Sequence, residues 1–202
     1  MRALSRDFYL RDAETAAREL LGKLLVHRQG GAETALIITE TEAYLGAGDP
    51  ACHSFGGKRT PRTEVLYGPG GHAYVYLIYG IHNLLNAVTG EEGDPCAVLI
   101  RAGLPFKGHD KISENRLGKP WGSLNASGRR TLCDGPGKLS AALGITRAQN
   151  GLDLTASGLM ICEGERRDTP SATIAAGPRI GVDYAGEAAL WPLNFKLILC
   201  NF

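Results

Sequence analysis

The chain has 202 residues, of which 44% are hydrophobic and 21% charged, and its formal net charge is +1. This length suffices for one domain with a sizeable core, and a second independent core would be cramped, so we expect a single domain over residues 1–202. The small net charge gives no global signal for a nucleic-acid partner. Basic residues are nevertheless concentrated in two stretches, 58–62 and 107–130.

The cysteines and the apolar segments exclude several classes of protein. The five cysteines are widely spaced and contain no C-x-x-C pair, which argues against a disulfide framework, a zinc site and an iron–sulfur cluster. No apolar run approaches the ~20 residues that cross a membrane, and the N-terminal segment lacks the continuous apolar stretch of a signal peptide. We expect a soluble cytoplasmic protein, associated with the nucleoid if its source is prokaryotic, with no metal and no cofactor.

The first predicted elements are a helix and a strand. From Asp12, which is placed to cap the first turn, apolar residues follow one helical stripe as far as Leu24. Residues 35–44 are β-branched and alternating, which predicts a strand that ends in a turn-rich loop. Because strand side chains alternate with a period of two, one face should hold Leu36, Ile38, Glu40, Glu42 and Tyr44. A face that changes from apolar to acidic and aromatic indicates a core that gives way to a cleft.

Three strands are expected next. Residues 72–79 and 84–89 predict two strands joined by a hairpin tip at 80–83, and residues 95–102 predict a nearly all-apolar strand with Arg101 at its end. The segment 106–131 is polar, basic and rich in Gly and Ser, with one short helix near 110–117, as is typical of a long functional loop.

The last third of the chain adds a helix and more strands. Pro136 near the first turn and Gly144 after the last predict a helix over residues 135–143. Further strands are expected at 159–163, 175–182 and 192–200.

Several ordered motifs, at consistent spacing, extend over nearly the whole chain. They are LLGKLL (20–25), ETEAYLG (40–46), HSFGGKRTPR (53–62), YVYLIYG (74–80), LCDGPGKL (132–139) and RIGV (179–182). With these motifs the chain resembles the DNA-3-methyladenine glycosylases of the alkyladenine (methylpurine) glycosylase family, monofunctional enzymes that excise alkylated and deaminated purines. Together with the predicted elements, the resemblance implies an α+β fold: a mostly antiparallel curved sheet or small partial barrel with flanking helices and a protruding hairpin.

The resemblance implies a hydrolytic site around one carboxylate. Hydrolysis of an N-glycosyl bond builds positive charge on the sugar and requires a water to attack the anomeric carbon, and a carboxylate can serve both needs. The resemblance assigns this role to Glu42 and places Arg101 near the same water. Glu40, on the same predicted face, is the rival candidate from spacing alone.

The resemblance also implies how a damaged base is held. Tyr44, His53 and Tyr76 match the walls of the family's base pocket, where the electron-rich face of a tyrosine attracts a cationic alkylated purine. Asn86 matches an asparagine that crowds the 2-position of the purine and so bars guanine.

The expected partner is double-stranded DNA that contains damaged purines, bound by a monomer. By resemblance Tyr79 is the wedge that fills the gap left by the extruded nucleotide. Basic side chains and helix amides are expected to grip phosphates. The candidates for phosphate binding are Lys58, Arg59, Arg62 and Lys138.

Three residues depart from the family pattern. Ile81 and His82 follow the wedge where Met and Tyr are expected, so affinity and lesion search could differ. Asn194 stands where an arginine is expected, which weakens the case for DNA contacts by the C-terminal segment.

Three other readings compete. A base deaminase needs a second cysteine after Cys96 to bind zinc, and the chain lacks it. A bifunctional glycosylase with lyase activity needs an amine nucleophile, for which Lys58 is the nearest lysine in the motif region. A non-catalytic nucleic-acid-binding module on the same scaffold has no reason to place Glu42 beside a phosphodiester.

Overall fold

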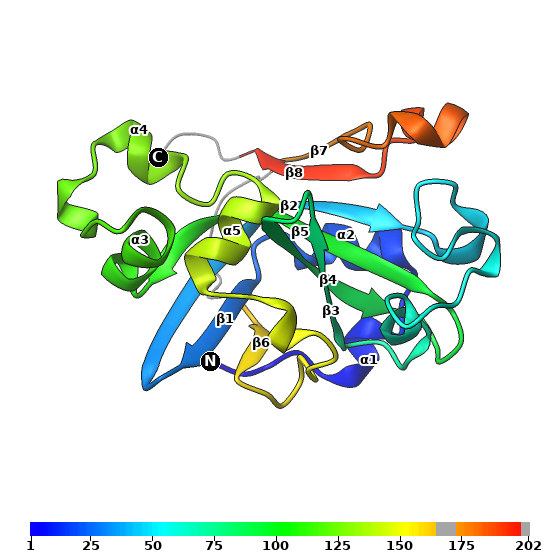
Figure 1. The fold of residues 1–202 in the computed structure, drawn as a ribbon, viewed down its shortest axis with the longest axis horizontal. Helices are drawn as coiled ribbons and strands as arrows, with labels where there is room; N and C mark the ends of the chain where they lie inside the picture. Colours follow the sequence, from blue (N-terminus) through cyan, green and yellow to red (C-terminus); the bar gives the residue numbers. More distant parts are fainter. Residues whose placement is uncertain (165–172, 199–202) are drawn as a thin grey trace.

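The computed structural model describes residues 1–164 and 173–198 (Figure 1). Its centre is a curled antiparallel half-barrel with strands in the spatial order β3-β4-β5-β2-β1-β6. These strands span Leu24–Gln29 (β1), Ala32–Tyr44 (β2), Ala73–Ile78 (β3), His82–Thr89 (β4), Cys96–Lys107 (β5) and Leu159–Cys162 (β6). The prediction of an α+β fold with a curved antiparallel sheet is confirmed.

A second hairpin extends this sheet beside the central strand. β8 (Asn194–Ile198) pairs with residues 40–42 of β2, on the edge that β1 leaves after residue 37, and β7 (Thr173–Gly177) pairs with β8. Figure 1 shows β7 and β8 across the top of the sheet. β7 ends at Gly177, five residues before the end of the strand expected over 175–182, because Pro178 has no N–H to continue the ladder. The last two positions of the strand expected over 192–200 lie outside the described residues.

The helices pack on this sheet around one large core. They are α1 (Arg6–Tyr9), α2 (Ala13–Leu20), α3 (His109–Leu117), α4 (Ala126–Arg130) and α5 (Pro136–Leu143). The predicted cap is confirmed, since the Asp12 carboxylate accepts a hydrogen bond from the Thr15 amide at 2.8 Å. Gly144 ends α5 with a φ of 67°, the left-handed conformation that glycine adopts readily. No helix within the described ranges has the length and hydropathy of a membrane span.

The prediction that five side chains of β2 share one face is wrong, and an irregular register explains the difference. Leu36 and Ile38 pack in the main core, but so does Ala43, and the Thr41 hydroxyl donates to the Ala17 carbonyl of α2. The pairing of β2 with β5 shifts on both sides of Glu40. A bulge of this kind inserts an extra residue and exchanges the faces that follow it. Glu40 and Glu42 therefore point away from the main core.

Arg101 lies inside a strand and not at its end, because β5 continues to Lys107. β4 pairs only with residues 96–99 of β5, so the later part of β5 is an edge, where Pro105 is tolerated. Glu40 stands opposite Ala102 and Thr41 opposite Ile100, so that no β2 residue faces Arg101. The same bulge thus redirects the arginine and the two glutamates.

The β3–β4 hairpin turns earlier than expected. β3 ends at Ile78 and β4 begins at His82, which makes Tyr79, Gly80 and Ile81 the tip. Tyr79 has a φ of 53°, and the residue is 85% exposed. The hairpin therefore carries an aromatic ring at its tip.

Candidate active site

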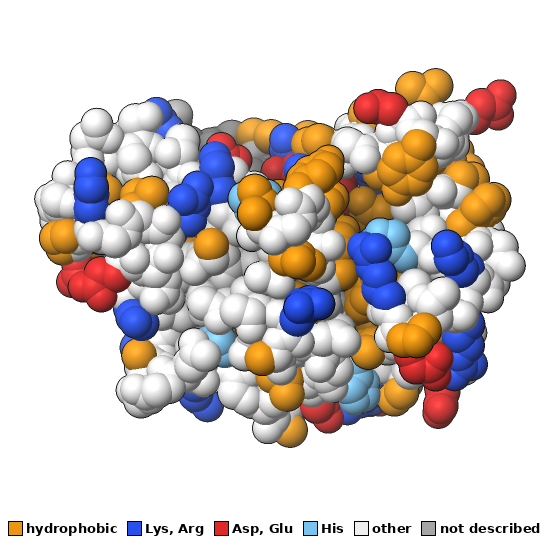
Figure 2. Space-filling view, viewed as in Figure 1, with side chains coloured by type: hydrophobic (Ala, Val, Ile, Leu, Met, Phe, Trp, Pro, Cys, Tyr) orange, Lys and Arg blue, Asp and Glu red, His pale blue; other side chains and the backbone are white. Residues whose placement is uncertain are grey.

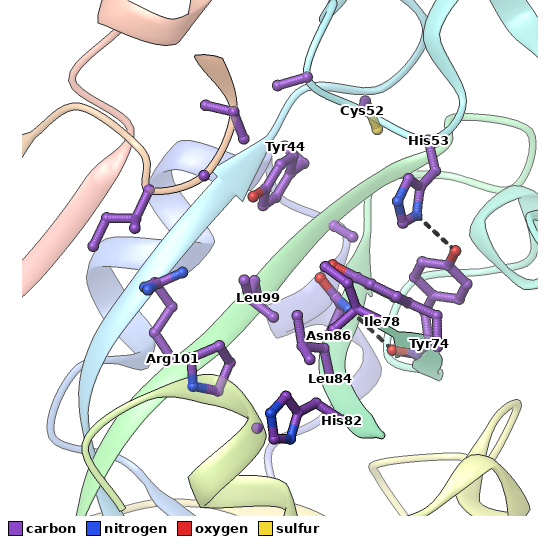
Figure 3. A pocket seen from close by; sticks show the side chains of 18 of the residues that line it. Tyr44, Cys52, His53, Tyr74, Ile78, His82, Leu84, Asn86, Leu99 and Arg101 are labelled. Atoms are coloured by element: carbon purple, nitrogen blue, oxygen red, sulfur yellow. Dashed lines mark hydrogen bonds between the residues drawn. The ribbon is translucent and has the colours of Figure 1, made fainter. Parts of the chain in front are cut away.

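A cavity of about 1070 Å³ opens between the β3–β4 hairpin, the loop after β2, the start of α5 and residues 180–184. Figure 3 shows the side chains of Tyr44, His53, Asn86 and Arg101 converging on it from different elements. Of the site residues expected from the sequence, all except Glu42 and Arg59 line this cavity.

Glu42 lies behind the cavity wall, fully buried and held by four donors. Its Oε2 accepts from the Tyr44 hydroxyl at 3.0 Å and from Arg101 Nη1 at 3.3 Å. Its Oε1 accepts from the Ile180 amide at 2.8 Å and from Asn194 Nδ2 at 3.1 Å. A carboxylate offers about four lone-pair positions, so this one is saturated. Tyr44, Arg101 and Ile180 line the cavity, whereas Asn194 and Glu42 itself do not.

Glu40 shares two of these donors but not the position of Glu42. Its Oε1 accepts from Arg101 Nε at 3.1 Å and from Asn194 Nδ2 at 2.8 Å, and Lys196 Nζ lies 3.5 Å away. Two carboxylates thus face two cations, which balances the charge of a nearly buried cluster. Glu40 does not line the cavity.

Tyr44 connects the carboxylate cluster to the cavity. Burial, and then the neighbouring Glu42 charge, raises the pKa of Tyr44 far above its usual value, so its hydroxyl keeps the proton that it donates. The guanidinium of Arg179 covers its ring at 4.9 Å from the centroid. Arg179 does not line the cavity, so it supports the ring from the far side.

His53 forms the opposite wall with two tyrosines of β3. Its ring lies 4.6 Å from that of Tyr76, edge to face, and its Nδ1 lies 2.9 Å from the Tyr74 hydroxyl (Figure 3). Arg62 Nη2 lies 3.4 Å from Nε2; because a guanidinium can only donate, Nδ1 carries the proton and donates to Tyr74. Burial, with the positive charges of Arg62 and Lys58, lowers the pKa of His53 to about 4. The ring is therefore neutral at pH 7.

Asn86 is buried at the floor of the cavity. It stands opposite Tyr74 on β3 and Leu99 on β5, and its Nδ2 donates to the Tyr74 carbonyl at 3.1 Å. This bond orients the amide in a cavity whose other floor residues, Leu84 and Leu99, are apolar.

The predicted phosphate-binding residues fall into two groups. Lys58, Arg62 and Lys138 line the cavity together with Arg116, and Figure 2 shows basic side chains around the hollow. Arg62 also lies over the Tyr76 ring, at 5.1 Å from its centroid. Arg59 points elsewhere: it pairs with Glu64 at 2.6 Å and stacks on Tyr67.

The sequence reasoning missed three contributors to the site. Asn194 bridges both glutamates, whereas its departure from the family pattern bore only on DNA contacts by the C-terminal segment. The Ile180 amide and the buried Arg179–Asp49 pair were equally hidden, because they are brought in from 130 to 154 positions away in the chain. The RIGV motif (179–182) contains Arg179 and Ile180 and was the only sign of them in the sequence, but the resemblance assigned it no role.

Comparison with known proteins identifies the family to which this site belongs. The family model for methylpurine-DNA glycosylase (MPG) matches residues 7–198. The chain belongs to the methylpurine-DNA glycosylase family.

Known relatives align with this chain over nearly their whole lengths. A "Putative 3-methyladenine DNA glycosylase" of Desulfitobacterium hafniense is 48% identical over 197 residues, covering 98% of this chain and 96% of the relative. Proteins of the same name are 50% identical over 196 residues in Methanocella arvoryzae (96% and 92% covered) and 47% over 195 residues in Clostridium acetobutylicum (96% and 94% covered).

Membership of the methylpurine-DNA glycosylase family identifies the type of reaction. The protein is a DNA glycosylase, a hydrolase of N-glycosyl bonds that acts on alkylated purines in DNA repair, and its substrate is damaged DNA. The resemblance inferred from the sequence is confirmed, and an enzyme is favoured over a non-catalytic binding module. In the described part of this glycosylase, no three His, Cys, Asp or Glu side chains gather into a possible metal site.

Proposed function

We propose that the protein, acting as a monomer without a cofactor, extrudes an alkylated or deaminated purine from duplex DNA into the cavity. There it hydrolyses the N-glycosyl bond with water activated by Glu42. One observation supports this most strongly: a fully buried carboxylate with four donors stands directly behind the wall of an aromatic cavity. The products are the free base and an intact strand with an abasic sugar.

The chemistry follows from the charge that develops on the sugar. The bond between the anomeric carbon and the purine nitrogen breaks with its electrons going to the base. A cationic alkylated base therefore leaves neutral, whereas a neutral deaminated base leaves as an anion that takes up the proton released by the attacking water. Water adds to the anomeric carbon and gives its proton to Glu42. The negative charge of Glu42 stabilises the cationic sugar in the transition state.

Access of water to Glu42 requires the exchange of one hydrogen bond, since all four positions are occupied. The Ile180 amide and Asn194 donate to Oε1, whereas Tyr44 and Arg101 donate to Oε2. The 3.3 Å bond from Arg101 is the longest of the four and therefore the one that water displaces most easily. We infer that the water takes a place on Oε2, between Glu42 and Arg101.

Recognition of the base rests on the aromatic walls. Tyr44 and Tyr76 offer electron-rich faces to a cationic purine, with a stacking contribution of about 1–3 kcal/mol per base. A neutral His53 suits this role, because a protonated ring would repel a positively charged base. Asn86 on the floor is proposed to exclude purines with a 2-amino group.

Contacts with the duplex complete the proposal. The exposed ring of Tyr79 fills the gap left by the extruded nucleotide. Lys58, Arg62 and Lys138 at the rim hold phosphates, and Arg59 joins them if DNA displaces Glu64.

Release of free base from duplexes with single lesions tests the function, and two matched variants test the mechanism. Glu42→Gln keeps the volume of the side chain but removes its charge and basicity, so excision should fall by about 10²–10⁴-fold with DNA affinity retained. Glu40→Gln makes the same change in the neighbouring glutamate of the same strand and should have the smaller effect. Normal turnover in Glu42→Gln combined with loss in Glu40→Gln would reverse the assignment.

A further inference from the structure

We propose that the buried Asp49–Arg179 ion pair is a positioning device for catalysis: it fixes both the Tyr44 ring and the Ile180 amide, and through them the Glu42 carboxylate. The inference rests on the proposed role of Glu42 as the base. Neither residue lines the cavity, so both act through others.

The pair is enclosed and well bonded. Both side chains are inaccessible to solvent, and both guanidinium Nη atoms donate to the carboxylate, Nη2 at 2.8 Å to Oδ1 and Nη1 to Oδ2. The Asp49 carboxylate also accepts from the Leu45 and Ala51 amides, each at 3.0 Å. Burial alone would raise the pKa of Asp49, and these hydrogen bonds outweigh it and hold that pKa below its usual value.

Asp49 thereby shapes the loop between the two walls of the base cavity. The amides that it binds lie just after Tyr44 and just before His53, which form opposite walls. Rotation or withdrawal of this carboxylate would release both ends of the loop.

Arg179 ties the loop to the carboxylate cluster. Its Nη1 donates to the Ala43 carbonyl at 3.0 Å and its Nη2 to the Ala188 carbonyl at 3.3 Å, while its plane covers Tyr44. The next residue, Ile180, donates its amide to Glu42 at 2.8 Å. One side chain therefore sets the position of two of the four groups that bind Glu42.

Stabilisation of the fold does not by itself explain why the chain contains a buried ion pair. Desolvation of two charges offsets much of their attraction, and buried ion pairs are often replaceable by apolar side chains without loss of stability. Precise placement of reacting groups is a stronger reason, since displacement by about 1 Å can cost ~10²-fold in rate.

The test compares Asp49→Asn with a matched change elsewhere. Single-turnover excision by Asp49→Asn, measured at saturating enzyme so that weaker binding of the base does not enter the rate, should be slower by about 10- to 100-fold. The control is Asp153→Asn, the same substitution in the Arg6–Asp153 pair, which lies outside the cavity and should leave the rate unchanged. If Asp49→Asn folds poorly by circular dichroism, Arg179→Lys keeps the charge but loses the planar contacts, and the same slowing is expected.

Combination with Glu42→Gln separates positioning from general weakening. If the pair acts through Glu42, Asp49→Asn should slow the Glu42→Gln enzyme by no more than about twofold, whereas independent effects multiply. An equal loss in both backgrounds, or a normal rate in folded Asp49→Asn, would overturn the inference. A normal rate in Glu42→Gln alone would instead overturn the proposed function.

Discussion

At the scale of single residues, charge decides what the cavity can accept. His53 is kept neutral by burial and by two neighbouring cations, Arg62 and Lys58. The carboxylates lie behind the wall and are matched by Arg101 and Lys196. The base therefore meets neutral aromatic surfaces, while the negative charge is held next to the position proposed for the sugar.

The lowered pKa of His53 predicts an acid-dependent loss of stability. An unfolded histidine titrates near pH ~6.5, and the folded ring near 4. Between these values the unfolded state binds the proton and the folded state does not, so the free energy of unfolding should fall as the pH drops from about 6.5 to about 4. Above pH ~6.5 this contribution to the pH dependence disappears.

His53→Gln should remove that part of the slope, as measured by urea unfolding at several values of pH. Asp49 and other acids contribute to the pH dependence of unfolding in both proteins, so their contribution cancels when the two slopes are compared. An identical slope in the two proteins would show that the folded His53 titrates normally.

Asn86→Ser should relax selection against purines with a 2-amino group, because it removes bulk at the cavity floor and leaves Glu42 and Arg101 in place. Single-turnover excision of guanine from mismatches should rise relative to hypoxanthine. The measurement needs thermal stability beside it, since Asn86 also bonds to the Tyr74 carbonyl. An unchanged ratio with a lower melting temperature would assign Asn86 to strand pairing alone.

Among the secondary-structure elements, the β2–β5 bulge positions the charged side chains and the β3–β4 hairpin carries the exposed tyrosine. The bulge directs Glu40, Glu42 and Arg101 to one place. The hairpin projects Tyr79 at its tip, in a left-handed backbone conformation that few residues other than glycine adopt. An exposed ring on a constrained turn fits insertion between bases.

Tyr79→Ala should therefore impair base extrusion more than bond cleavage. Loss of stacking worth about 1–3 kcal/mol corresponds to roughly 5- to 150-fold in excision from a well-paired site. A mispaired lesion is already weakly stacked and should suffer less. Tyr79→Phe retains the ring and serves as the matched control, with near-normal rates. Equal losses on paired and mispaired lesions in Tyr79→Ala would argue against insertion.

In the whole molecule, residues far apart in the chain line one cavity, in which we propose that the reaction takes place. Water as the nucleophile leaves no covalent intermediate, so borohydride should trap no cross-link between protein and DNA during turnover. Lys58 and Lys138 are the lysines that line the cavity, and both are proposed to bind phosphates. A trapped species that disappears in Lys58→Arg would establish lyase chemistry instead.

Local patterns in the sequence were enough to predict most helices and strands. The cap at Asp12, the helix that begins at Pro136 and the helix near residues 110–117 follow from short-range hydrogen bonding and sterics, and all three are confirmed. Several ordered motifs along the chain together identified the family, and most of the expected site residues do line one cavity. Family likeness transfers residue types at matched positions, which is why these assignments needed no coordinates.

Tertiary structure alone decided the surroundings of Glu42. Strict alternation along β2 failed after Ile38, because the bulge there depends on the partner strand β5, which no pattern within β2 encodes. Asn194 and Ile180 reach Glu42 from 152 and 138 residues away. Such contacts depend on how the chain closes, since hydrogen-bond donors are chosen by distance in space. The motifs in the sequence therefore pointed to Glu42, and the fold determined which groups hold it.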